Sequence, residues 1–354
     1  MNPIIQEDIQ NILSKDLPWD KLQGERILIT GATGMLASYL VYTVCAWMKK
    51  HPDSNTELVL AVRNPEKTRE RFENLLKIKN VSVVIWNGTD DFDYAEQITY
   101  IIHAASIADS SMFMKIPVET IEPNVIGTWK LLQLAYKHHT KGFLFFSTGS
   151  VYGKVSNCAT ISETDMGYLL PQDVRSCYGE SKRMGENLCA CFAHEYQVPA
   201  YAVRISHTYG PTMDLKNDTR VFADFVRNIL KNENITMKSD GAAKRAFCYI
   251  ADATEAFFRI LFGGEPGQVY NMCNSDQFVS IAELAQMMVE LFPERNLQVI
   301  RQVRSITDSY SENKHANTDV LSNLKLKTLG WNPEIGISEG FRRTIESFEK
   351  RGRD

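Results

Sequence analysis

A regular alternation of short apolar segments with longer amphipathic segments limits most strongly how this chain of 354 residues can fold. Six apolar segments have the length and composition of buried strands: RILIT (26–30), ELVLAV (57–62), VSVVIW (81–86), YIIHAAS (100–106), GFLFFST (142–148) and PAYAVRIS (199–206). The segments between them show helical periodicity, most clearly at 122–139 and 178–196. Strands that are apolar on both faces and alternate with helices predict an α/β fold with a doubly wound parallel sheet.

The first predicted strand runs directly into a glycine motif, TGATGMLA (30–37). Gly31 would permit a tight turn, and Gly34 would let the backbone approach a pyrophosphate at the start of the next helix, where free N–H groups favour anions. A strand, a glycine turn and a helix in this order predict a Rossmann-type dinucleotide cradle. We assign to it Gly31, Thr33, Gly34, Met35 and Leu36.

The alternation weakens beyond residue 206, which predicts a second and smaller lobe. We expect an N-terminal helical extension over 1–23, a dinucleotide-binding Rossmann domain over 24–206 and a C-terminal substrate lobe over 207–354. A segment near 245–258 is expected to return to the first domain.

The end of the second strand should contact the adenosine ribose of the cofactor. NAD sites place an acid there, whereas this chain has Arg63 and no acid before Glu66. An arginine can pair with a 2′-phosphate, so Arg63 favours NADP over NAD. A solvated arginine beside NAD is the alternative.

Tyr178 and Lys182 form a Y-x-x-x-K pair, and positions i and i+4 share one face of a helix. A nearby ammonium would lower the pKa of the phenol, so that it could take a proton from a sugar hydroxyl. Thr148 ends the fifth predicted strand, where open α/β sheets bind ligands, and its hydroxyl could hydrogen-bond the reacting oxygen. These three residues are the predicted catalytic group.

With these pieces in order, the chain resembles extended short-chain dehydrogenases/reductases of the sugar-nucleotide epimerase/dehydratase family over about residues 25–350. The resemblance is carried by TGATGMLA, HAAS, NVIGT, STGSVYG, YGESK, RISHTYGP, KRAF and LGWNP. It implies an NAD(P) cofactor, a nucleotide-sugar substrate and a homodimer formed through the helices at 122–139 and 178–196. It also implies that Ala104, Ala105 and Ser106, in HAAS, contact the cofactor, as do Tyr178 and Lys182.

Within the family, the segments 103–128 and 175–189 are most similar to UDP-glucuronate decarboxylases. That likeness implies that Arg245 contacts the substrate; a cation bridging the two lobes is the alternative.

Two positions depart from the family pattern. Decarboxylases and 4,6-dehydratases are similar in having an acidic residue directly before the V-Y-G triplet, and here that residue is Ser150. The family's asparagine before T-[YF]-G-P is His207. We place both in the substrate site; for His207 a structural histidine is the alternative. Glu163 and Glu180 are the nearest acids in sequence that could compensate for Ser150, and neither is assigned.

Thr148, Tyr178 and Lys182 are sufficient for reversible oxidation of a sugar carbon, so we expect an epimerase that acts through a transient 4-keto sugar. The alternatives are an NADPH-dependent 4-keto-sugar reductase and a UDP-glucuronate decarboxylase or 4,6-dehydratase that recruits another acid. A non-enzymatic binding protein would have no use for the Tyr178–Lys182 pair.

Bulk properties exclude other classes of protein. The net charge of −4 gives no basic surface for nucleic acid, and no apolar run is long enough to span a bilayer. The N-terminus does not resemble a secretory signal. The seven scattered cysteines suggest core residues in a reducing compartment rather than a metal site. We therefore expect a cytoplasmic protein without a metal.

Overall fold

The computed structural model describes residues 1–155, 159–302 and 320–351. Its centre is a seven-stranded sheet in the order β11-β7-β5-β4-β1-β2-β3, and all neighbouring strands pair in parallel. The strands are β1 (Arg26–Thr30), β2 (Glu57–Val62), β3 (Val81–Ile85), β4 (Tyr100–His103), β5 (Gly142–Thr148), β7 (Ala200–Ile205) and β11 (Val269–Met272). The predicted α/β Rossmann architecture is confirmed.

All six strands expected from the sequence form, and one further strand joins them. Strand β4 ends at His103, three residues earlier than expected, because the chain leaves the sheet there as a loop. The additional strand, β11, is short and carries the polar Asn271, so it lacks the apolar run typical of a buried strand. Inside the protein Asn271 is buried and accepts a hydrogen bond from the Tyr152 hydroxyl at 2.6 Å.

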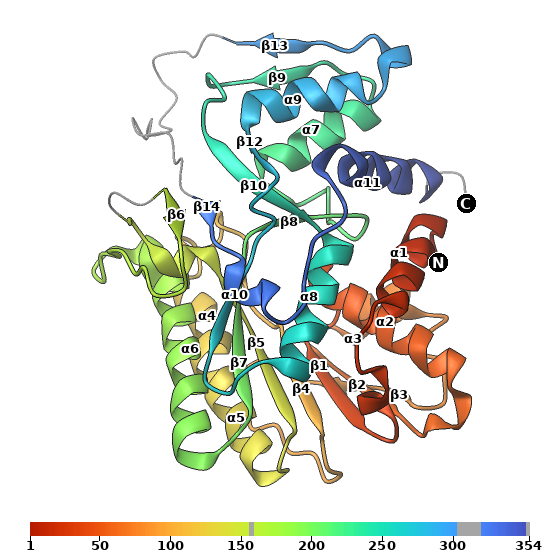
Figure 1. Cartoon of the computed structure of the whole chain (residues 1–354), viewed down its shortest axis with the longest axis vertical. Helices are drawn as coiled ribbons and strands as arrows, with labels where there is room; N and C mark the ends of the chain where they lie inside the picture. Colours follow the sequence, from red (N-terminus) through yellow and green to blue (C-terminus); the bar gives the residue numbers. More distant parts are fainter. Residues whose placement is uncertain (156–158, 303–319, 352–354) are drawn as a thin grey trace.

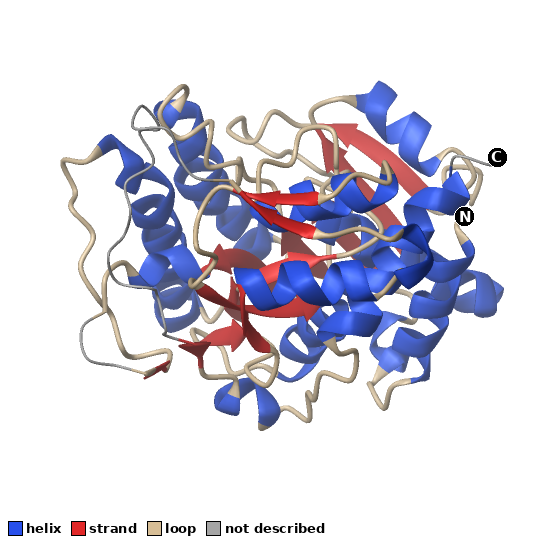
Figure 2. Ribbon diagram, turned by 90° about the horizontal axis from the view of Figure 1, so that it is seen from above, coloured by secondary structure: helices blue, strands red, loops and turns tan. Residues whose placement is uncertain are grey.

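Helices cover both faces of the sheet (Figure 2). On one face lie α2 (Met35–Lys50) and α8 (Ile250–Gly263), and on the other α4 (Pro117–Glu122), α5 (Thr128–Lys137) and α6 (Cys177–Tyr196). The helix expected over 122–139 is interrupted by a π-helical turn, η3 (Pro123–Gly127). Pro123 has no N–H to donate to the preceding turn, which explains why the regular hydrogen bonding breaks there.

The smaller lobe lies beyond the carboxyl ends of the strands (top of Figure 1). Its main sheet has the order β12-β10-β8, from β8 (His207–Tyr209), β10 (Lys244–Tyr249) and β12 (Phe278–Ser280). Around it lie β9 (Ile235–Met237), β13 (Val299–Arg301), α7 (Val221–Leu230), α9 (Ile281–Glu290) and α11 (Ile337–Arg351). Three short elements connect the lobes: β6 (Thr160–Ile161), β14 (Val320–Leu321) and α10 (Leu324–Lys327). After β10 the chain returns to the large sheet through α8 and β11.

The N-terminal helix α1 (Pro3–Ser14) packs between the lobes, beside α11 (Figure 1). Its Asp8 is buried and accepts hydrogen bonds from the hydroxyls of Tyr39 and Tyr249, each at 2.7 Å, and from Arg343 at 2.8 Å. Burial raises the pKa of Asp8, while Arg343 opposes that shift. One carboxylate thus joins α1 to α2, β10 and α11.

No helix in the described ranges is both long and apolar enough to cross a membrane. The six cysteines within those ranges are free, and all except Cys191 are buried; Cys158 lies outside the described residues.

Candidate active site

A cleft of about 1750 Å³ lies between the large sheet and the smaller lobe. It opens at the carboxyl ends of the strands, where β1 and β4 are neighbours and the strand order reverses; such switch points bind ligands in α/β sheets. The cleft is lined by the predicted residues Thr33, Gly34, Met35, Leu36, Arg63, Ala104, Ser106, Thr148, Ser150, Tyr178, Lys182, His207 and Arg245. The other two, Gly31 and Ala105, pack against each other, and a Cβ on Gly31 would lie 2.7 Å from the Ala105 Cα.

The glycine motif forms a turn that suits a phosphate. Gly31 has a positive φ of 62°, and the Gly34 N–H donates to its carbonyl at 2.8 Å. Helix α2 then begins at Met35, with no side chain capping its first N–H groups. The buried Ser106 Oγ, across the cleft, has no hydrogen-bond partner within the described residues. Free N–H groups and an unpartnered hydroxyl fit a dinucleotide in this cradle.

His103, the last residue of β4, hydrogen-bonds groups around the loop that follows it. Its Nε2–H donates to the Pro123 carbonyl at 3.0 Å, and its Nδ1 accepts from the Thr30 hydroxyl at 2.8 Å. The Thr30 oxygen in turn accepts from the Ala105 N–H at 3.2 Å. Burial, with a smaller contribution from Lys182, lowers the pKa of His103 to about 3. The neutral ring therefore fixes the loop that contains Ala105.

The end of β2 carries positive charge. Arg63 is exposed, lines the cleft and makes no hydrogen bond or ion pair with other described residues. Lys67, on the first turn of α3 (Pro65–Phe72), lines the same region, and its N–H donates to the Asn64 side chain at 3.0 Å. Glu66 does not line the cleft.

Thr148, Ser150 and Tyr178 form a chain of hydroxyl groups. The Thr148 hydroxyl donates to the Ser150 Oγ at 3.3 Å and accepts from the Ser150 N–H at 3.2 Å. Thr148 and Tyr178 line the same cleft, and the Thr148 hydroxyl acts on the pKa of the phenol. Burial raises the pKa of Tyr178 to about 12, against an opposing contribution from Thr148. The lowered pKa expected beside Lys182 is therefore not found, because desolvation of the phenol dominates. The predicted threonine and tyrosine thus meet in the cleft, although they are thirty residues apart in sequence.

Lys182 lies one helical turn after Tyr178 and is only 1% exposed. Its Nζ donates to the Phe146 carbonyl at 2.6 Å and lies 5.9 Å from the centroid of the Tyr178 ring. Burial lowers the pKa of Lys182 to about 7, against an opposing contribution from Glu186. The Lys182 amine is therefore held close to the phenol.

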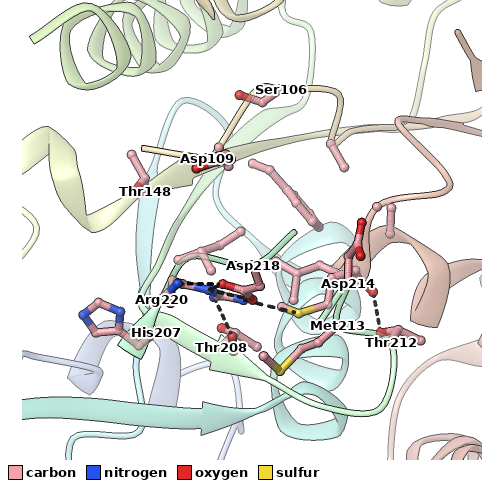
Figure 3. Close-up of a pocket in the computed structure, with 18 of the residues that line it drawn as sticks. Ser106, Asp109, Thr148, His207, Thr208, Thr212, Met213, Asp214, Asp218 and Arg220 are labelled. Carbon is pink, nitrogen blue, oxygen red and sulfur yellow. Dashed lines mark hydrogen bonds and ion pairs between the residues drawn. The ribbon is translucent and has the colours of Figure 1, made fainter. Parts of the chain in front are cut away.

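Basic side chains from the smaller lobe line the opposite wall, and Figure 3 labels Arg220 and His207. His207 begins β8 and exposes its side chain to the cleft; desolvation by the cleft walls, then the charges of Arg245 and Arg220, lower its pKa. Arg245, on β10, donates to the Lys244 carbonyl at 2.7 Å.

Sequence reasoning missed Arg220. Its guanidinium is paired with Asp218 at 2.5 Å and donates to the Thr208 carbonyl at 3.0 Å. It also missed Phe113, whose ring stacks on Tyr178. Neither residue belongs to a motif, so only the folded chain brings them to the site.

The two acids considered as replacements for the missing carboxylate are engaged elsewhere. Glu163 accepts a hydrogen bond from the Asn271 N–H at 2.9 Å, and Glu180 lies 3.4 Å from Arg183. Neither lines the cleft. Asp109 does line it, and its Oδ1 accepts from the Ser111 N–H at 2.9 Å and from the Thr219 hydroxyl at 3.4 Å (Figure 3).

Comparison with known proteins agrees with the fold and shows the family. UDP-glucuronic acid decarboxylase 6 of Arabidopsis thaliana is 28% identical over 326 residues, covering 92% of this chain and 89% of the relative. The UDP-glucose 4-epimerase of Thermotoga maritima superposes with a TM-score of 0.72 at 22% identity, covering 92% of this chain and 99% of its own. The UDP-glucuronic acid 4-epimerase of Bacillus cereus, solved in complex with NAD, gives 0.71 at 21% identity, with coverages of 92% and 99%. The model of the NAD dependent epimerase/dehydratase family matches residues 27–273, and the chain belongs to that family of enzymes.

Proposed function

We propose that the protein is an NAD(P)-dependent nucleotide-sugar epimerase that acts through a transient 4-keto sugar. The observation that carries the proposal is that Thr148, Tyr178 and Lys182 line one cleft. Beside them is Ser150, at the position where decarboxylases and dehydratases are similar in having an acidic residue. Neither Glu163 nor Glu180 lines the cleft, so neither replaces the missing acidic residue.

The cofactor, when bound, would accept hydride from the sugar carbon and return it. Tyr178 would take the proton of the sugar hydroxyl and later give it back, and Thr148 would hydrogen-bond the same oxygen. Lys182, close to the Tyr178 ring, favours the phenolate when it is charged. Reversing the configuration requires the keto sugar to turn over before hydride returns.

The substrate would place its diphosphate toward the smaller lobe. Arg245, Arg220 and His207 line that wall, and guanidinium groups suit phosphate oxygens. The relatives named above act on UDP-linked sugars, which supports a nucleoside-diphosphate sugar as substrate.

We assign NADP(H) as the preferred cofactor. Arg63 and Lys67 line the cleft at the end of β2, where an NAD enzyme would favour an acid. Two cations there would attract a 2′-phosphate.

We further propose a homodimer formed through α4, η3, α5 and α6. Large apolar side chains lie exposed on these helices: Val118, Ile121, Ile126, Trp129, Tyr136, Met184 and Tyr196. An apolar surface of this kind, on helices that pack against one another, indicates a protein–protein interface.

Product analysis tests the proposed reaction. The purified protein is incubated with a panel of nucleotide sugars, and the products are followed by mass and NMR. An isomer of equal mass supports the epimerase. A gain of two hydrogens would identify a reductase, and loss of carbon dioxide or water a lyase of the decarboxylase or dehydratase type. Decarboxylation is the strongest competitor, because the decarboxylase relative aligns over nearly the whole chain.

A further inference from the structure

The segment that follows β8 belongs to the smaller lobe yet lies against the glycine turn of the large lobe. Thr212 is 1% exposed, and its hydroxyl donates to the Met35 carbonyl at 2.9 Å (Figure 3). Met35 is the first residue of α2, directly after Gly34. The smaller lobe therefore contacts the start of the helix that forms the cradle.

A single guanidinium reinforces this contact. Arg71, from α3, donates through one Nη to the Thr33 carbonyl at 2.6 Å and through the other to the Thr212 carbonyl at 2.9 Å. Thr33 belongs to the glycine turn and Thr212 to the smaller lobe, so the planar fork joins the two. Arg71 itself lines the cleft.

Arg220 adds a weaker contact at the same place. The Nη2 that donates to Asp218 at 2.5 Å also lies 3.9 Å from the Met35 Sδ. Thr212 and Arg220, the two ends of the segment 212–220, thus both contact Met35. These contacts lie on the rim of the cleft that the cofactor would occupy.

We propose that Arg71 and Thr212 clamp the glycine turn to the smaller lobe, so that a bound dinucleotide leaves only after these contacts break. They are positioning residues: they hold Thr33 and Met35 and do not take part in the chemistry. The inference rests on the dinucleotide site of the proposed function and deepens it. An epimerase returns its hydride to the same sugar and gains from retaining its cofactor, whereas a reductase must exchange its cofactor at each turnover.

The rate of cofactor release tests the clamp without any sugar substrate. Protein loaded with NADH or NADPH is mixed with a large excess of NAD⁺ or NADP⁺, and the loss of bound-cofactor fluorescence is followed. We expect Arg71→Gln and Thr212→Val to release the cofactor about tenfold faster or more, the effect of losing a hydrogen bond to a charged or buried partner. Thr212→Ser keeps the hydroxyl and should restore the wild-type rate.

Arg69→Gln is the matched control, since Arg69 is exposed on the same helix and does not line the cleft. Thermal unfolding of each variant without cofactor checks that the fold is intact; Thr212→Val preserves shape and serves if Arg71→Gln does not fold. Wild-type release rates in folded Thr212→Val, or an equal acceleration in Arg69→Gln, would overturn the clamp. Because no sugar is present, failure here is distinct from failure of the epimerase assay.

Discussion

The ring of Phe113 lies parallel to the ring of Tyr178, with centroids 4.6 Å apart and an interplanar angle of 16°. The loop that carries Phe113 is held to the same helix, because the Cys177 thiol donates to the Phe113 carbonyl at 3.7 Å. Phe113 therefore keeps water from one face of the phenol. This desolvation contributes to the burial that raises the pKa of Tyr178 to about 12.

Replacing Phe113 with leucine should lower the pKa of Tyr178, because water reaches the phenolate and stabilises it. Since the phenolate is the proposed base, the rising limb of kcat/KM against pH should move to lower pH, and kcat should fall as the ring loses its fixed orientation. The pH profile of kcat/KM, which reports groups of the free enzyme, measures the shift. Phe113→Tyr keeps the stack and should retain the wild-type profile. An unchanged limb in Phe113→Leu would show that the stack does not influence the phenol.

Tyr178→Phe should reduce turnover by roughly 10²–10⁴-fold, the usual contribution of a general acid or base. Cofactor affinity should stay nearly unchanged, because only the hydroxyl that meets Thr148 is lost. Turnover on the true substrate and a binding titration with NAD(P)H separate the two effects. Wild-type turnover in this variant would remove Tyr178 from the mechanism.

Arg63→Asp should reverse the cofactor preference from NADP(H) to NAD(H). A carboxylate at the end of β2 would accept from the ribose hydroxyls and repel a 2′-phosphate. Calorimetry on the cofactor-free protein gives both affinities, with Arg69→Asp as a control outside the cleft lining. If the wild type already binds NAD(H) more tightly, Arg63 is a solvated neighbour of the site.

The buried ion pair between Arg204 and Glu186 should contribute strongly to the free energy of unfolding. Arg204 and Glu186 lie 2.7 Å apart with side chains 5% and 8% exposed, and the Ser147 hydroxyl also donates to Glu186. Arg204→Met leaves a buried carboxylate unpaired, which costs roughly 3–5 kcal/mol of unfolding free energy. Urea unfolding at neutral pH measures the loss.

Adding Glu186→Leu to Arg204→Met should recover most of that loss, because the buried carboxylate that lost its partner is removed. Lys130→Met removes an exposed pair with Asp91 and should cost about 1 kcal/mol or less. A similar small loss in Arg204→Met would mean that water reaches Glu186.

The sequence predicted those parts of the fold that depend on local pattern. Strand β5 and the glycine turn have the expected bounds, because an apolar run and a strand–glycine–helix order need no distant partner. The π-helical turn was missed, since helical periodicity continues through Pro123. Strand β11 was missed because Asn271 finds its hydrogen bonds only in the folded protein.

The residues of the candidate site also fall into those that a local motif predicts and those that only the folded chain brings together. Thr148, Tyr178 and Lys182 could be named from motifs, and the structure places them together in one cleft. Phe113 and Arg71 belong to no motif, and their roles depend on partners brought close by the fold, such as Tyr178 and Thr212. Spacing in the sequence carries no signal for such contacts.

Ser150→Glu tests what the serine excludes. The Ser150 N–H already donates to the Thr148 hydroxyl, so a glutamate there would place a carboxylate beside the catalytic group without moving the backbone. We expect the wild type to give no 4,6-dehydration of nucleotide-linked glucose and little or no carbon dioxide from UDP-glucuronate. The variant should gain a trace of one of these activities, because the additional acid or base is supplied.

Ser150→Gln, of the same length but without an ionisable group, should gain neither. Mass analysis of the product and carbon dioxide release measure both reactions. Robust decarboxylation by the wild type would contradict the epimerase, and would mean that a cleft carboxylate such as Asp109 supplies the missing acid.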